Sequence, residues 1–160
     1  MESPPEIVDR LRTCLDEHTP TLRDALRAAL TERTFPPHAM FKGRPAPALD
    51  ERDALCGIHV EYSYPGWVPS IIGLSRAGAV KCGARHPFGR GASLVDADLE
   101  EIDEELAGET VEGWIMTAWR AVRDVAPELR GYVSIHDTLH RVDMDTGVTV
   151  RRDAMGMGWL

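Results

Sequence analysis

The segment His136-Asp137-Thr138-Leu139-His140 has the spacing of a metal-dependent hydrolase motif. In the H-E-x-x-H motif a helix presents both imidazoles on one face as zinc ligands, and the acid between them acts as general base. Asp137 is one methylene shorter than that glutamate, and no histidine follows His140 to supply a third ligand. His136, Asp137 and His140 are therefore catalytic candidates in an incomplete pattern, and the sequence favours a binding role over an enzyme.

The same region also has the alternation of a β-hairpin, which competes with the helix. Residues 139–152 alternate between apolar and polar, and Gly147 ends a three-residue turn that begins at Asp145. A three-residue loop of this kind suits a type I turn followed by a bulge, with the glycine at positive φ. We expect Val142 to pair with Val150, which places every apolar residue of the hairpin on one face.

A glycine-rich segment, residues 83–91, offers groups that bind anions. It carries Arg85, His86 and Arg90. Guanidinium groups and backbone N–H groups in such a loop can hold a phosphate or carboxylate. The segment matches neither of the standard phosphate-loop motifs, so an anion site and a mobile basic loop remain alternatives.

Two cysteines and two histidines could together form a zinc site, namely Cys56, His59, Cys82 and His86. Cys56 and His59 are three residues apart on a predicted strand, so their side chains should face opposite sides of a sheet. We therefore expect no metal and no other cofactor.

Seven acidic residues lie within ten positions, from Asp96 to Glu105. We expect a helix over residues 93–108, in which the later acids repel one another at i,i+4 spacing. One interpretation is a solvated face that keeps the protein soluble, and the other is a docking surface for a basic partner. The candidate docking residues are Glu100, Glu101, Asp103, Glu104 and Glu105, with Trp159 of the apolar tail, residues 154–160, which could also join two copies of the chain.

The composition limits the classes of protein to consider. The chain has 160 residues and a net charge of −8, which fits one domain with one core. The negative charge disfavours nucleic-acid binding and favours a basic protein partner. No apolar run is long enough to span a membrane, no signal peptide begins the chain, and the three cysteines are scattered. These features predict a cytoplasmic protein without disulfides.

The order of predicted elements indicates an α+β fold. Helices at 3–33 precede a proline-rich crossing loop at 35–50, and the sheet and remaining helices occupy 55–153. Strands are expected at 55–64, 70–75 and 79–82, and a tryptophan-rich helix at Thr110–Val125. No regular β-α alternation appears, which argues against a doubly wound parallel sheet. We expect a single domain with an antiparallel sheet of five or six strands and helices packed on one face.

The most consistent functional interpretation is a small acidic interaction protein that binds a partner protein. In size, charge and lack of a complete catalytic constellation, the chain is similar to small bacterial immunity proteins, which neutralise toxins. The similarity is one of class, because no family motif matches residue by residue. The alternatives are a small-ligand-binding or metal-dependent hydrolytic enzyme that uses residues 136–140, and a structural subunit of a larger assembly that uses the tail.

Overall fold

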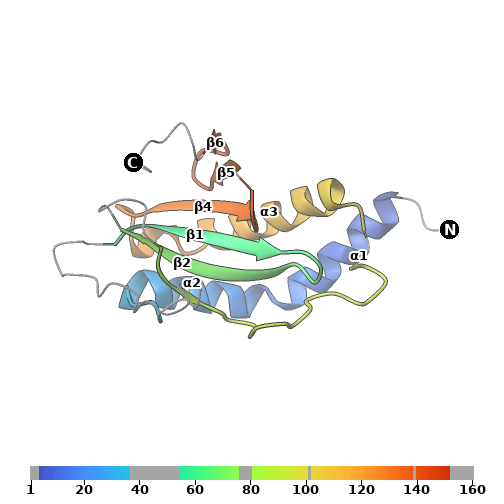
Figure 1. Ribbon diagram of the computed structural model, residues 1–160, viewed down its shortest axis with the longest axis horizontal. Helices are drawn as coiled ribbons and strands as arrows, with labels where there is room; N and C mark the ends of the chain where they lie inside the picture. The colour runs from blue at the N-terminus through green and yellow to red at the C-terminus, as the bar shows by residue number, and fades with distance from the viewer. Residues whose placement is uncertain (1–3, 37–54, 76–80, 101, 139, 152–160) are drawn as a thin grey trace.

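The computed structural model describes residues 4–36, 55–75, 81–100, 102–138 and 140–151. The described elements form a six-stranded sheet and three α-helices, which confirms the α+β class (Figure 1). In chain order they are α1 (Pro4–Glu17), α2 (Thr19–Glu32), β1 (Leu55–Ser63), β2 (Val68–Ser75), β3 (Lys81–Arg85), α3 (Glu104–Arg120), the 3-10 helix η1 (Arg123–Val125), β4 (Arg130–Ile135), β5 (His140–Asp143) and β6 (Thr149–Arg151).

The strands lie in the order β3-β2-β1-β4-β5-β6, and the sheet is mixed. Four of the neighbouring pairs are antiparallel, as the sequence predicts, whereas β1 and β4 are parallel. Parallel neighbours need a long crossover connection. Here the chain between β3 and β4, which includes α3, supplies that crossover and brings β4 beside β1.

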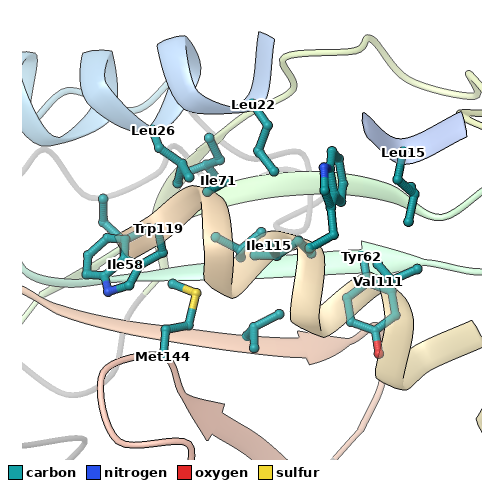
Figure 2. Close-up of a cluster of buried hydrophobic side chains, with 14 of the residues drawn as sticks. Leu15, Leu22, Leu26, Ile58, Tyr62, Ile71, Val111, Ile115, Trp119 and Met144 are labelled. Atoms are coloured by element: carbon teal, nitrogen blue, oxygen red, sulfur yellow. The ribbon is translucent and has the colours of Figure 1, made fainter. Parts of the chain in front are cut away.

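The core lies between the helices and one face of the sheet (Figure 2). On β1, the residues at alternate positions Ile58, Val60 and Tyr62 are buried on this face. Leucines from α1 and α2 and the inner face of α3 pack against them. Burial of a large apolar side chain contributes ~1.5–3 kcal/mol, so this one face supplies most of the driving force for folding.

The acidic segment is not the helix that the sequence predicts for residues 93–108. The described residues between 91 and 102 form turns, bends and irregular structure, and the helix begins at Glu104. Asp103 is its N-cap, because the carboxylate accepts hydrogen bonds from the backbone N–H groups of Glu105 and Leu106, both at 3.1 Å. The helix predicted for Thr110–Val125 is the rest of the same helix, which ends at Arg120.

The C-terminal hairpin is confirmed as β5 and β6, but its register is shifted by one residue. Val142 pairs with Thr149 instead of Val150, and Val148 is 59% exposed. The shift follows from Asp143, whose carboxylate accepts two N–H groups of the loop at 2.9 Å, so that the turn begins at Met144, one residue early. Gly147 has φ of 72°, as expected for the end of the turn.

Some predicted segments fall on residues whose placement is not described. Most of the crossing loop at 35–50 and the whole tail at 154–160 lie outside the described ranges. The third strand is described at Lys81–Arg85 instead of 79–82. In the part of the chain that the structure describes, no helix is long and apolar enough to cross a membrane.

Candidate functional site

The sheet face opposite the core carries a row of polar side chains. On β1 the residues between the core positions are His59 and Glu61. Glu61 pairs with Ser70 of β2 on one side and with Ser134 of β4 on the other. Side chains that lie directly opposite each other in neighbouring strands have Cβ atoms ~4.5–5.5 Å apart. Polar groups from three strands therefore meet on this face.

Four side chains, those of Ser134, His59, Glu61 and His136, lie in a row that leads from the sheet to the solvent. The Nε2 atom of buried His59 is 2.8 Å from the Ser134 hydroxyl, and its Nδ1 atom is 3.9 Å from Oε2 of Glu61. The other carboxylate oxygen of Glu61 accepts a hydrogen bond from Nδ1 of His136 at 2.5 Å. The Glu61 side chain is 12% exposed and that of His136 is 50% exposed, so the row ends at an accessible imidazole.

His136 opens onto a cleft of about 550 Å³. Its titratable lining residues are Glu61, Tyr62, His86, Arg90, Glu100 and His136. His86 also contacts β2, because its Nδ1 atom is 2.9 Å from the hydroxyl of Ser70. Burial and the nearby guanidinium of Arg90 lower the pKa of His86 below its usual value. The cleft therefore combines a neutral imidazole, a carboxylate–imidazole pair and a guanidinium.

Local turns explain how these side chains reach the cleft. The backbone N–H of His136 donates to the carbonyl of Tyr62 at 2.8 Å, which extends the parallel pairing by one residue. Asp137 then takes a positive φ of 62° and reverses the chain. Across the cleft, Gly66 at φ 92° accepts the N–H of Leu94 at 2.9 Å. This contact couples the β1–β2 turn to the segment after β3.

A second hollow, of about 420 Å³, lies beside the first and shares Tyr62 with it. Four glutamates of α3 line it, Glu104, Glu105, Glu109 and Glu112. The Tyr62 hydroxyl donates to Glu112 at 3.0 Å. Burial raises the pKa of the Glu112 carboxyl, and burial together with Glu112 raises the pKa of the Tyr62 hydroxyl.

The structure separates the predicted catalytic residues. His136 and Asp137 form a turn after β4, which ends at Ile135, and His140 is the first residue of β5, so His136 and His140 do not share a helix. The Asp137 side chain is 88% exposed, and its carboxylate lies 3.4 Å from Nε2 of His136. Of the three candidates, only His136 lines the cleft. No group of three or more His, Cys, Asp or Glu residues in the described ranges could hold a metal ion.

The predicted anion-binding residues are also divided. His86 and Arg90 line the cleft. Arg85 instead forms an ion pair with Glu32 at 2.7 Å and donates to the carbonyl of Thr34 at 2.8 Å. Arg85 and His86 are neighbours at the end of β3, so the alternation of a strand sends them to opposite faces.

The predicted zinc ligands point to different partners. The Cys56 thiol contacts the carbonyl of Leu74 at 3.2 Å, whereas His59 contacts Ser134 on β4. His86 lines the cleft, and the side chain of Cys82 is not described. Cys56 sits at a bulge in the β1–β2 pairing.

The acidic docking candidates have several different environments. Glu100 lines the cleft, and Glu104 and Glu105 line the second hollow. Asp103 caps α3, and nearby Asp98 forms an ion pair with Arg10 at 2.6 Å. Glu101 and Trp159 lie outside the described residues.

Three residues of this polar row, Glu61, Ser70 and Ser134, carry no motif that would mark them as functional in the sequence. The alternation of residues 55–64 already places His59 and Glu61 on one strand face. Their partners could not be found that way, because the parallel pairing of β1 with β4 joins residues about 75 positions apart. Comparison of the chain with protein-family models, with curated proteins and with solved structures finds no match.

Proposed function

We propose that the protein binds a small polar ligand in the cleft and contacts it through His136. The observation that supports this most is the ion pair of His136 with Glu61 at the edge of a hollow that also holds His86 and Arg90. A concave site with a few convergent polar groups and a perturbed histidine is the usual form of a ligand site. An ion pair that only stabilises a flat surface would not lie at the edge of such a cleft.

Arg90 indicates the charge of the ligand. It is exposed at the rim of the cleft, and no ion pair joins it to another residue in the described ranges. Guanidinium groups recognise carboxylates and phosphates through paired hydrogen bonds. On either side of Arg90, Gly89 and Gly91 have positive φ and no atoms near their missing Cβ positions, which leaves the rim open. The ligand we propose therefore carries one anionic group and a hydroxyl or amine that reaches His136.

The test is a binding screen that compares small carboxylates and phosphates with uncharged analogues, read by protein-detected NMR. Anionic compounds should shift the resonances of the cleft. Arg90→Gln should weaken their binding about tenfold, the scale of one lost charge-assisted hydrogen bond. Arg120→Gln removes the same charge from the exposed end of α3 and serves as control. Equal affinities for both variants, or a screen without any hit, would contradict the proposal.

A second candidate function is the capture of a basic partner protein, of the kind an immunity-like protein would neutralise. The observation that favours it is the second hollow, which is lined by four glutamates and borders the cleft that holds Glu100. Complementary charge raises the rate of encounter between two proteins and fixes their orientation. A lysine or arginine side chain of the partner would enter this hollow.

The partner hypothesis is tested with two variants of equal charge. One carries Gln in place of Glu100, Glu104, Glu105 and Glu109. The control carries Asn or Gln in place of four exposed acids elsewhere, Asp16, Glu17, Asp24 and Asp124. The partner is sought by native mass spectrometry of the protein from its own host. Loss of a bound polypeptide in the first variant alone supports this function, and equal retention in both removes it.

A further inference from the structure

We infer that His136 and Glu61 form a proton-accepting pair, in which Glu61 fixes the imidazole as the Nδ1–H tautomer and His59 and Ser134 position Glu61. The ligand group that this pair fits is a hydroxyl or a water molecule, which gives its proton to Nε2. The inference deepens the proposed ligand site, and it rests on that proposal only for the identity of the molecule that donates the proton.

The tautomer follows from the partner of each ring nitrogen. A carboxylate can only accept hydrogen bonds. Glu61 lies 2.5 Å from Nδ1, so in neutral His136 that nitrogen carries the proton, and Nε2 keeps its lone pair. Asp137 lies 3.4 Å from Nε2, but it is 88% exposed and solvated. An exposed carboxylate attracts weakly through water, so the closer and more buried Glu61 decides the tautomer.

Glu61 is itself held from the side of the sheet. Its Oε2 atom faces Nδ1 of His59, which is 1% exposed. The Ser134 hydroxyl is 2.8 Å from Nε2 of His59. When that hydroxyl donates to Nε2, the remaining ring proton of His59 lies on Nδ1, which is 3.9 Å from Oε2 of Glu61, so this contact is electrostatic and longer than a hydrogen bond. His59 and Ser134 are thus positioning residues for the carboxylate, whereas Glu61 and His136 line the cleft.

The chemistry of the pair is a reversible proton transfer. The O–H bond of the ligand or water breaks, a bond from that proton to Nε2 of His136 forms, and the electron pair stays on oxygen. The imidazolium that results is neutralised by Glu61, and Asp137 lies on the side of the new N–H bond. Arg90 lines the same cleft and offers a positive charge to the oxygen anion.

The tautomer can be measured without a ligand by ¹⁵N NMR of the imidazole rings at alkaline pH. Wild-type His136 should show a protonated Nδ1 and an unprotonated Nε2. Glu61→Gln retains a carbonyl acceptor and should keep this pattern, whereas Glu61→Val removes the acceptor and should abolish it. Asp137→Asn should leave it unchanged. A protonated Nε2 in the wild type, or the same pattern in Glu61→Val, would overturn the inference.

A second measurement reports how fast the Nε2 lone pair of His136 reacts with an electrophilic reagent. Diethyl pyrocarbonate is attacked by a neutral imidazole nitrogen, which bonds to the carbonyl carbon while ethyl carbonate leaves, and mass spectrometry follows each histidine separately. His136 should react faster than exposed His140, and Glu61→Gln should slow His136 about tenfold, the scale of one lost hydrogen bond to a charged group. Ser134→Ala should slow it less, and His140 should not change in either variant.

Equal rates for His136 and His140, or no effect of Glu61→Gln on His136, would refute the role of Glu61. A merely structural role for Ser134 would lower stability without any change in the reactivity of His136. Both measurements are independent of the ligand screen. If the ligand screen finds no hit but His136 has the expected tautomer and reactivity, the proposed ligand is wrong and the His136–Glu61 pair stands. If the screen finds a ligand but the tautomer or the reactivity differs from the expectation, the pair is wrong and ligand binding stands.

Discussion

Replacement of Gly131 by alanine tests the packing that holds β4, and with it His136, beside β1. Gly131 lies opposite Ile58 in the parallel pair. A Cβ atom at this glycine would lie 2.6 Å from two ring carbons of Trp119 and 2.7 Å from the methyl carbon of Met144. Ordinary van der Waals contact begins at 3.4 Å. The indole therefore occupies the space that any side chain at this position would need.

The cost depends on which neighbour can move. The end of Met144 is flexible, but Trp119 is fully buried and its ring N–H donates to Asp145 at 2.9 Å. A shift of the indole would strain that hydrogen bond. Overpacking in a close-packed core costs ~1–3 kcal/mol. For a domain of this size we expect Gly131→Ala to lower Tm by roughly 4–8 °C, equivalent to ~2 kcal/mol.

The matched control is Gly113→Ala. Gly113 is exposed in α3, and no atom lies within 4 Å of its missing Cβ. Alanine there should stabilise the protein by ~0.5–1 kcal/mol, because glycine in a helix interior costs conformational entropy. Urea unfolding at a single pH measures both variants. If Gly131→Ala is as stable as the wild type, the close contact with Trp119 is wrong and the register of β4 must be reconsidered.

Two further predictions concern the hairpin and the second hollow. Asp145→Ala should lower the free energy of unfolding, measured with urea, by ~1–3 kcal/mol, because it removes the acceptor of the buried Trp119 indole N–H. The control Asp124→Ala should change it by no more than ~0.5 kcal/mol. Equal effects of the two variants would contradict the hydrogen bond between Trp119 and Asp145. For Glu112, burial raises the pKa of the folded carboxyl, so the folded state binds the proton more tightly and wild-type stability is lost as the pH rises above the usual value of 4.5. Glu112→Gln removes this loss, so unfolding curves should show the variant gaining stability relative to the wild type as the pH rises above 4.5. A difference in stability that does not change with pH would exclude the effect.

The strand pattern could be predicted from the sequence because it is local. Alternation in residues 55–64 places His59 and Glu61 on the face opposite Ile58 and Val60, and the structure has the same arrangement. The approach of His136 could not be predicted in this way. It requires β4 to lie parallel to β1, and the long connection through α3 decides that pairing.

The two errors of the sequence prediction arise from aspartate hydrogen bonds and from packing against the core, neither of which the hydrophobic periodicity contains. The hairpin register shifts because Asp143 binds the loop N–H groups, while the next aspartate, Asp145, accepts the indole N–H of Trp119 from α3. The acidic segment is not helical before Asp103, where Leu94 and Leu99 are buried against the core from turns. Periodicity reports which residues are apolar, but it does not report that an aspartate will begin a turn or a helix at a given position.

The polar face of β1 is the part of the fold that packing alone does not explain. Burial of His59, Ser134 and most of Glu61 costs free energy, which their mutual contacts offset only in part. The opposite face of the same strand already supplies a complete apolar core, so apolar residues in these three places would serve stability at least as well. Departures of this kind from the apolar pattern concentrate at functional sites. The row ends at an accessible imidazole beside a cleft, and this connection makes the pair of His136 and Glu61 the place to look for chemistry.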